Sequence, residues 1–174
     1  MKYLEIRYIN EYDNKMEISE IYEKSWRYAY KDIIPQEFLD SIEKGKWIPI
    51  LDFTDWRTVV CIENGKYIGT ISFSKSRFQE YFSYGEIISF YILPEYIGKG
   101  YGNKILKYVI KELYGLGYSQ LLLWVLEDNY LAKKFYKKNG FIETDNYMVD
   151  NIGGKELKEV MFIYKNEDML GNYK

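Results

Sequence analysis

The segment from Ile92 to Asn103 places the strongest constraint on what this chain can fold into. It reads ILPEYIGKGYGN, follows a β-branched and aromatic run, and precedes an apolar segment with helical spacing. A strand that enters a glycine-rich turn and then a helix exposes unpaired backbone N–H groups at the positive end of the helix dipole. Glycine permits both the tight turn and the close approach of a ligand. The pattern therefore predicts an anion site, and above all a phosphate site.

Two common phosphate-binding motifs do not fit this spacing. A dinucleotide fingerprint requires G-x-G-x-x-G, but here the third glycine is Gly102, directly followed by Asn103. Gln120 and apolar neighbours stand where an acidic residue would hold a ribose. A P-loop requires Ser or Thr after its lysine, whereas Lys104 is followed by Ile105. A G-x-G-x-G turn alone is equally consistent with an ordinary helix start.

A second pattern, from Asn129 to Phe141, follows another strand-like apolar run. Asn129 suits a helix N-cap, and Ala132 and Tyr136 recur at helical spacing. The helix should stop before Gly140, because glycine after a helix end tolerates the left-handed conformation. The chain thus predicts a second strand–helix unit after the glycine turn.

Together the two segments resemble the GCN5-related N-acetyltransferase superfamily (GNAT), the acetyl-CoA-dependent enzymes. The family's first motif, [Q/R]-x-x-G-x-[G/A], fits Ile97 to Gly102 except at Ile97 itself. Its second motif, N-x-x-A-x-x-[F/L]-Y-x-x-x-G-F, matches Asn129 to Phe141 throughout. The similarity covers roughly residues 58–148. In this family main-chain N–H groups hold the pyrophosphate, so Ile97 weakens one contact without removing the site.

The resemblance implies an α/β (mixed α+β) fold. It has a central, mostly antiparallel mixed sheet of about six to seven strands, flanked by helices, with the fourth and fifth strands splayed apart. We expect one acetyltransferase domain over residues 1–165 and a polar tail over 166–174. Local patterns place strands near residues 3–9, 59–62, 67–73, 85–93, 119–126, 141–149 and 157–164, and helices near 13–30, 35–43, from about 100 and from 129.

Composition narrows the function classes. The chain has 174 residues, of which 47% are hydrophobic, so one globular domain with an ample core is expected. A net charge of −2 gives no reason to expect nucleic acid or an anionic membrane as partner. The single cysteine, Cys61, excludes an internal disulfide and is expected in the core. With no signal peptide evident, we expect a cytoplasmic protein.

The chain contains no histidine, so it lacks the commonest general base and the commonest metal ligand. No metal is therefore expected. Acid–base chemistry would fall to carboxylates, tyrosines, lysines or water. The resemblance implies Glu86, on the fourth strand, as the general base acting directly or through water, although a strand-end carboxylate paired with lysine would have the same sequence. It implies Tyr136 as proton donor to the departing thiolate of CoA.

Acetyl-CoA is the expected co-substrate. The resemblance implies that the glycine turn binds its pyrophosphate, that the backbone of the fourth strand and Asn129 hold its pantetheine arm, and that Lys138 either reaches a phosphate or lies on a solvated helix face. The predicted cofactor-binding residues are Ile92, Leu93, Ile97, Gly98, Lys99, Gly100, Tyr101, Gly102, Asn103, Asn129 and Tyr136.

The acceptor site should lie at the first helices, the last hairpin and the loop before the fourth strand, which flank the acetyl end in this superfamily. Trp26 and Tyr30 share a helix face and, with Tyr84, are candidate lining residues; they fit the core equally well. The sequence predicts a small-molecule or peptide amine as substrate. An antibiotic, a polyamine, an amino acid and a protein amino terminus are all consistent with it.

Three functions remain open. The first is an N-acetyltransferase that moves an acetyl group from acetyl-CoA to a primary amine by direct transfer in a ternary complex. The second is a catalytically inactive CoA-binding sensor or partner protein on the same fold, which Ile97 favours slightly. The third is a structural domain whose glycine turn is incidental, which the fully matched second motif disfavours. A homodimer is consistent with the superfamily, but no sequence feature decides it.

Overall fold

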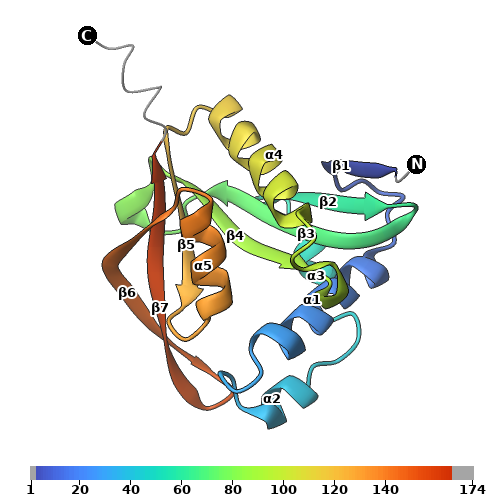
Figure 1. Cartoon of the computed structure of the whole chain (residues 1–174), viewed down its shortest axis with the longest axis horizontal. Helices are drawn as coiled ribbons and strands as arrows, with labels where there is room; N and C mark the ends of the chain where they lie inside the picture. The colour runs from blue at the N-terminus through green and yellow to red at the C-terminus, as the bar shows by residue number, and fades with distance from the viewer. Residues whose placement is uncertain (1–2, 166–174) are drawn as a thin grey trace.

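The computed structural model describes residues 3–165, which form one seven-stranded sheet with helices on both faces (Figure 1). The strands lie in the order β1-β2-β3-β4-β5-β7-β6, and β4 and β5 are the one parallel pair within the described chain. The strands are β1 (Leu4–Tyr8), β2 (Arg57–Glu63), β3 (Lys66–Lys75), β4 (Gly85–Ile92), β5 (Gln120–Leu126), β6 (Ile142–Ile152) and β7 (Lys155–Lys165). The α-helices are α1 (Lys15–Ala29), α2 (Gln36–Asp40), α3 (Ile48–Leu51), α4 (Tyr101–Gly115) and α5 (Tyr130–Lys138), and 3₁₀ turns cover Gln79–Tyr81 and Pro94–Tyr96.

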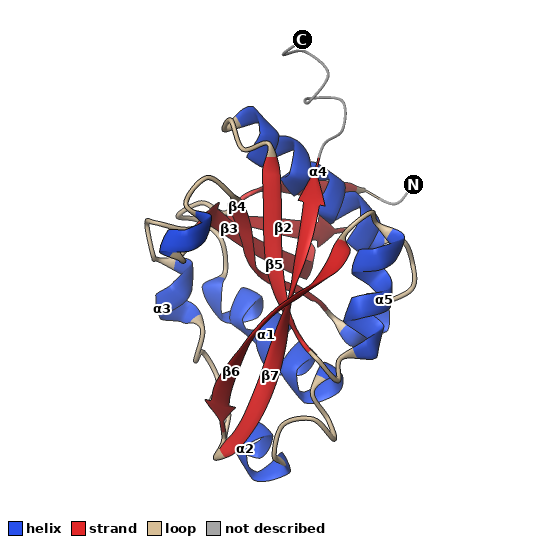
Figure 2. Ribbon diagram, turned by 90° about the vertical axis from the view of Figure 1, so that its left-hand side faces the viewer, coloured by secondary structure: helices blue, strands red, loops and turns tan. Residues whose placement is uncertain are grey.

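Both faces of the sheet are buried, and β2 shows why. Val59 and Cys61 belong to the apolar cluster beneath α4 and α5, whereas Val60 and Ile62 belong to the cluster beneath α1, α2 and α3. All four side chains are buried. A strand covered on both faces must be apolar at successive positions instead of alternating, and the run VVCI meets that requirement. Figure 2 shows the two helical layers on either side of the strands. The expected core position of Cys61 is confirmed.

Helix α4 is held on the sheet by one apolar stripe. Ile105, Leu106, Val109 and Leu113 recur at helical spacing, and each is completely buried. Burial of four such side chains is worth several kcal/mol in total, at about 1.5 to 3 kcal/mol each. The stripe fixes the start of α4, and hence the glycine turn before it, against the centre of the sheet.

The parallel pair β4–β5 separates soon after it begins. Register partners occur only at Gly85–Leu121, Glu86–Leu122 and Ile87–Leu123. From residue 88 onward β4 keeps its pairing with β3, and β5 keeps its pairing with β7, so the two strands run apart (Figure 1). The predicted splay of the fourth and fifth strands is confirmed, as is the mixed, mostly antiparallel sheet.

The β6–β7 hairpin is anchored to the N-terminal helices by its tip. Gly153 has a positive φ of +63°, and a Cβ built on it would lie 2.6 Å from the Cβ of Phe38 on α2. The Lys155 ammonium donates a hydrogen bond of 2.9 Å to the carbonyl of Ile33. The hairpin tip and α2 are also neighbours in Figure 2. These contacts bring the last hairpin beside the first helices.

The structure confirms every strand and long helix that the sequence predicts, with boundaries shifted by a few residues. The short helix α3 was not predicted, because it has four residues and contains Pro49, so it shows no helical periodicity. The predicted tail lies outside the described residues, and the single-domain assignment stays a prediction. No helix of residues 3–165 is long and apolar enough to span a membrane.

Candidate active site

The separation of β4 from β5 opens a cavity of about 860 Å³ that reaches both faces of the sheet. One end, the glycine-turn end, is formed by Ile97, Gly98, Gly100, Gly102 and Asn103. The other, the hairpin end, is formed by Met148, Asp150 and Ile152 of β6, Glu159 of β7, and Trp26 and Tyr30 of α1. Between the two ends the cavity is lined by β4, β5 and α5, including Ile92, Trp124, Asn129 and Tyr136.

The glycine-turn end presents backbone donors. Gly98 and Gly100 have positive φ values of +77° and +87°, and a Cβ on either would meet nothing within 4 Å. Gly100 is the N-cap of the fifteen-residue helix α4 and supplies no side-chain cap. Among the described residues, no N–H group of residues 98–103 donates to a protein acceptor, and the helical ladder begins with Lys104 donating to Gly100. The turn is therefore open above and rich in unpaired donors.

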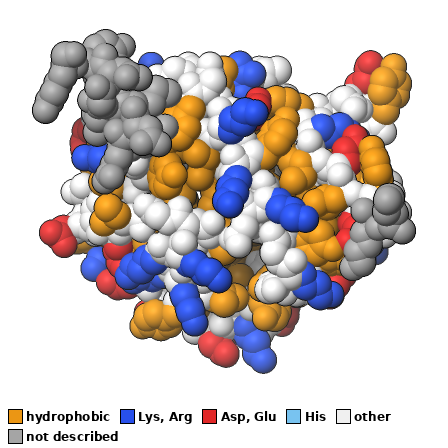
Figure 3. All heavy atoms as spheres, turned by 45° about the horizontal axis from the view of Figure 1, so that its top comes forward, with side chains coloured by type: hydrophobic (Ala, Val, Ile, Leu, Met, Phe, Trp, Pro, Cys, Tyr) orange, Lys and Arg blue, Asp and Glu red, His pale blue; other side chains and the backbone are white. Residues whose placement is uncertain are grey.

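Lysines surround this end. Lys134 and Lys138 of α5 line the cavity, and neither forms an ion pair within the described chain. The neighbouring Asn139 donates a hydrogen bond of 3.0 Å to Asn103, which ties the end of α5 to the start of α4. Figure 3, which brings the α4 side of the molecule forward, shows Lys and Arg side chains across the middle of that face and most acidic ones towards its rim. The local charge favours an anion.

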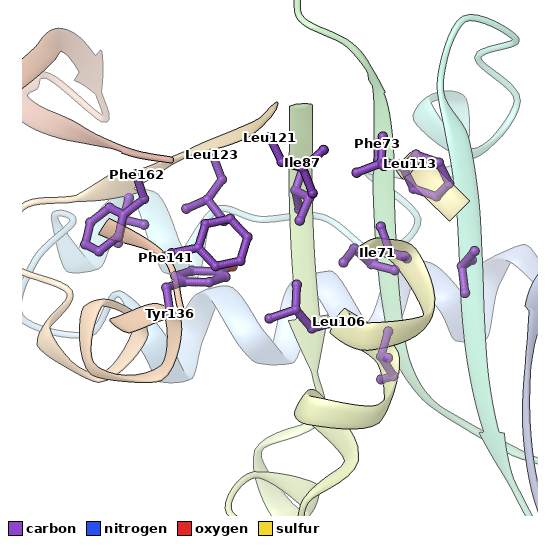
Figure 4. Packing of buried hydrophobic residues seen from close by; sticks show 14 of the residues in the cluster. Ile71, Phe73, Ile87, Leu106, Leu113, Leu121, Leu123, Tyr136, Phe141 and Phe162 are labelled. Carbon is purple, nitrogen blue, oxygen red and sulfur yellow. The ribbon is translucent and has the colours of Figure 1, made fainter. Parts of the chain in front are cut away.

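Tyr136 lies where the cavity passes between the sheet halves. Its ring is 9% exposed and packs 5.6 Å from the ring of Phe141 and 6.3 Å from that of Phe162 (Figure 4). Its hydroxyl has no hydrogen-bond partner among residues 3–165, although the side chain lines the cavity. Burial, and secondarily the nearby Tyr91, raises the pKa of this hydroxyl above its ordinary value. Tyr136 thus brings a phenol that is protonated at neutral pH to the wall of the cavity.

Asn129 also lines the cavity, and its predicted N-cap role is confirmed. Its side-chain oxygen accepts a hydrogen bond of 3.2 Å from the N–H of Ala132, in the first turn of α5. Its amide nitrogen makes no hydrogen bond within the described chain. A donor is therefore left beside Tyr136 for a bound molecule.

The hairpin end carries carboxylates. Met148, Asp150 and Ile152 alternate along β6 and so share one face. Glu159 is the register partner of Met148, which places its side chain on that same face. Within residues 3–165 no hydrogen bond or ion pair reaches the Glu159 carboxylate. Burial first, and the charge of Asp150 second, raise the pKa of Glu159.

Aromatic rings from α1 close the hairpin end. The rings of Trp26 and Tyr30 meet edge to face at 5.0 Å, and both line the cavity. Burial raises the pKa of Tyr30 to about 12, with a smaller contribution from the negative charge of Glu159. The indole N–H groups of Trp26 and Trp124 are buried and make no hydrogen bond in the described chain. Trp26 and Tyr30 pack against the apolar cluster on this face and also line the cavity, and their role in the acceptor site stays a prediction.

Glu86 occupies a different position from that expected of an accessible base. Its side chain is 0% exposed, and it is absent from the cavity lining. One carboxylate oxygen accepts hydrogen bonds from Arg77 Nε at 3.0 Å and from Nη2 at 2.7 Å, and the other accepts from the Arg77 backbone N–H at 2.8 Å. Arg77 itself does line the cavity. The role of Glu86 as base stays a prediction, and Arg77 occupies three of the roughly four acceptor positions of its carboxylate.

Four other predicted residues lie outside the cavity lining. Leu93 is buried, with its N–H donating to Ile68 at 2.9 Å, whereas its neighbour Ile92 does line the cavity. Tyr101 is buried with its hydroxyl donating to Glu63. The Lys99 ammonium lies 5.3 Å from the centre of the Tyr96 ring. Tyr84 packs edge to face on the ring of Tyr81 at 5.6 Å.

The structure adds lining residues that the sequence did not indicate, chiefly Arg77, Trp124, Met148, Asp150 and Glu159. Strand pairing places Met148, Asp150 and Glu159, since β6 and β7 reach the cavity through the pairing of β7 with β5. Glu159 follows Lys155, Glu156 and Lys158 in the same strand, so the sequence alone did not single it out.

A splayed mixed sheet with an open glycine turn at a helix start defines the N-acetyltransferase fold. The chain belongs to the acetyltransferase (GNAT) family, whose sequence profile matches residues 15–141. A comparison with curated proteins gave no match.

Solved structures share the fold at low identity. The PaiA N-acetyltransferase of Thermoplasma acidophilum, determined with coenzyme A, is 22% identical over 94% of this chain and 99% of that chain, with a TM-score of 0.72. The ribosomal-protein-S18-alanine N-acetyltransferase of Escherichia coli is 16% identical over 94% of each chain, with a TM-score of 0.67. At these identities the likeness establishes the fold alone.

Proposed function

We propose that this protein is an acetyl-CoA-dependent N-acetyltransferase that acetylates a primary amine by direct transfer in a ternary complex. The observation that carries the proposal is the row of unpaired N–H groups of residues 98–103, at the start of α4 and at one end of the cavity. Such a row binds a phosphate group through hydrogen bonds and through the helix dipole. Family membership makes the pyrophosphate of acetyl-CoA the expected occupant.

The residues present fit that ligand. The open space above Gly98 and Gly100 is what close approach of a pyrophosphate requires. Lys134 and Lys138 add positive charge beside it. Between the splayed strands, Ile92 and Asn129 offer a strand edge and an amide to an extended arm. The PaiA structure with coenzyme A supports this assignment, because it is a complex of the same fold.

Acetyl-CoA would supply an activated acetyl group as a thioester. The amine nitrogen forms a bond to the acetyl carbon, the carbon–sulfur bond breaks, and the sulfur leaves as a thiol after gaining a proton. Tyr136 is the residue of this chain placed to give that proton, since it lines the cavity and a tyrosine hydroxyl is protonated at neutral pH. The proton lost from the amine nitrogen as the amide forms returns the phenol to its starting state.

An inactive CoA-binding protein on the same fold is the alternative, and Ile97 is the observation that favours it. This side chain is 37% exposed at the position where the family motif has Gln or Arg. Release of free thiol from acetyl-CoA in the presence of a panel of amines distinguishes the enzyme from the inactive protein, because the inactive protein would bind CoA without turnover. The cytoplasm, which contains acetyl-CoA and keeps Cys61 reduced, is the compartment we propose for either.

The first test is thermal unfolding with acetyl-CoA, CoA, ATP and NAD added separately. A ligand at about 100 times its dissociation constant adds about 2.7 kcal/mol of stability, which raises the melting temperature by several degrees for a chain of this size. We expect a rise with acetyl-CoA and with CoA but none with NAD. If neither CoA species has an effect, the proposed function is wrong.

A further inference from the structure

The hairpin end carries two negative charges that the proposed function leaves unexplained. Arg77, Glu86, Asp150 and Glu159 are the charged groups that face one another there. Arg77 forms an ion pair of 2.7 Å with Glu86, and its charge also acts on Glu159, where it lowers the pKa against the larger effects of burial and Asp150. Asp150 and Glu159 remain, and within residues 3–165 neither has a cationic partner in an ion pair. The acceptor end of the cavity is therefore net negative.

Geometry places Glu159, and not Glu86, within reach of a molecule in the cavity. Glu159 lines the cavity together with Tyr136, Tyr30 and Trp26, and its carboxylate oxygens are unpaired within the described chain. Glu86 is wholly buried, and Arg77 engages both of its oxygens. A general base must lie at hydrogen-bond distance from the proton that it removes before its pKa matters, and Glu86 does not line the cavity.

We propose that Glu159, with Asp150 beside it, receives the acceptor as an alkylammonium ion and removes its proton before acetyl transfer. This inference rests on the proposed function and names its acceptor class and its base. One N–H bond of the ammonium breaks and one O–H bond forms on Glu159, so the amine becomes neutral and the carboxylate becomes a carboxylic acid. The proton passes to solvent after the product leaves, and the reaction releases one proton per acetyl group.

The chemistry explains why such a residue is needed. An alkylamine with a pKa near 10.4 is neutral in only about one molecule in 2,500 at pH 7. Burial and the neighbouring Asp150 raise the pKa of Glu159, which makes its carboxylate a better proton acceptor. The rings of Trp26 and Tyr30 border the same space, and aromatic faces attract ammonium ions. The groups that attract the ammonium ion, orient it and remove its proton thus lie together at the hairpin end of the cavity.

The first experiment measures binding without turnover. The protein saturated with CoA is titrated with n-butylamine, 1,4-diaminobutane and glycinamide at pH 7, and binding is followed by amide chemical shifts. We expect at least one amine to bind, and Glu159→Gln to weaken it about tenfold or more. Glu156→Gln is the matched control, because Glu156 is an exposed acid on the same strand that does not line the cavity. Equal binding by wild type and Glu159→Gln, or no binding by either, overturns the inference.

The second experiment measures kcat/KM against pH with the amine that binds best. General-base catalysis contributes about 100-fold to 10,000-fold, so Glu159→Gln should lose at least 100-fold at pH 7. The deficit should shrink as the pH approaches the pKa of the amine, because the neutral amine no longer needs a base. A deficit that is the same at every pH contradicts proton removal by Glu159. Acetyl-CoA binding is measured separately for each variant, and its absence in the wild type contradicts the proposed function instead.

Discussion

The two ends of the cavity are formed by different parts of the chain: one by backbone groups and the other by side chains. The glycine-turn end is made of backbone: its donors are N–H groups, and its glycines matter for the space they leave open. The hairpin end is made of side chains, with aromatic rings from α1 and carboxylates from β6 and β7. A backbone site recognises a group common to every member of a family, whereas a side-chain site can change with single substitutions. We infer that the first end fixes the cofactor class and the second fixes the acceptor.

Tyr136 lies between the two ends of the cavity, and its substitution should cause a large loss of turnover. Tyr136→Phe removes one hydroxyl from a packed ring, so we expect kcat to fall about 100-fold while the dissociation constants of acetyl-CoA and amine stay within about twofold. Tyr130→Phe is the control, because Tyr130 lies on the same helix and is 72% exposed. Steady-state thiol release and equilibrium titration measure the two quantities. An unchanged kcat would assign Tyr136 to packing alone.

The difference between the ends also explains what could be predicted from the sequence. The glycine-turn end was predictable because one contiguous stretch, 92–103, contains the strand exit, the turn and the helix start. The splay of β4 and β5 was predictable from the family resemblance. Trp26 and Tyr30 were predictable as a pair because helical spacing puts them on one face.

The hairpin end was not predictable in the same way. Its members come from segments separated by more than one hundred residues, and only the pairing of β7 with β5 brings Glu159 opposite α1. The family resemblance pointed to Glu86 from its place on the fourth strand, which does not reveal that Arg77 engages the carboxylate. Single acids such as Glu159 and Asp150 resemble any solvated charge until the sheet order is known.

The hairpin end also depends on how α1 is anchored, which the pH dependence of stability can test. Asp13, just before α1, accepts two hydrogen bonds of 2.7 Å from the Arg7 guanidinium and one of 2.6 Å from the Tyr67 hydroxyl. Chiefly because of Arg7, the pKa of Asp13 falls from 3.8 to about 2. A depressed pKa stabilises the fold above pH 3.8, and that stability is lost as the pH falls towards 2.

Asp13→Asn should therefore lower the free energy of unfolding by about 2 kcal/mol at pH 7. The difference from wild type should shrink as the pH falls below 3.8 and be mostly lost at pH 2, as measured by urea unfolding at a series of pH values. Asp55→Asn is the control, because Asp55 is exposed and forms no ion pair within the described chain. A difference that persists undiminished to pH 2 would show that the Asp13 charge is not what holds α1.

Glu86→Gln tests whether Glu86 or Glu159 is the general base. The change leaves Arg77 without its counter-charge, so we expect the free energy of unfolding to fall by about 1 to 2 kcal/mol. It should also weaken amine binding several-fold, because a positive charge is uncovered at the hairpin end. The rise of kcat/KM with pH should keep its wild-type shape. If that rise is lost in Glu86→Gln and kept in Glu159→Gln, Glu86 is the base, as the family resemblance implies.

Replacing Gly100 with alanine, with Gly65→Ala as control, separates the role of the glycine turn in cofactor binding from its role in folding. We expect this to be the smallest of the effects. Gly100 and Gly65 have nearly equal φ values of +87° and +83°, and a Cβ on either would meet nothing within 4 Å. Alanine at either position should cost about 1 kcal/mol of stability, because a side chain disfavours the left-handed conformation. Gly65 lies in the β2–β3 turn, outside the cavity lining. Gly100→Ala alone should therefore weaken acetyl-CoA about tenfold, by calorimetric titration, since its methyl group occupies the space above the unpaired N–H groups. Equal affinities of the two variants for acetyl-CoA would mean that the cofactor does not approach this turn. The backbone end of the cavity could then no longer be assigned to the cofactor and the side-chain end to the acceptor.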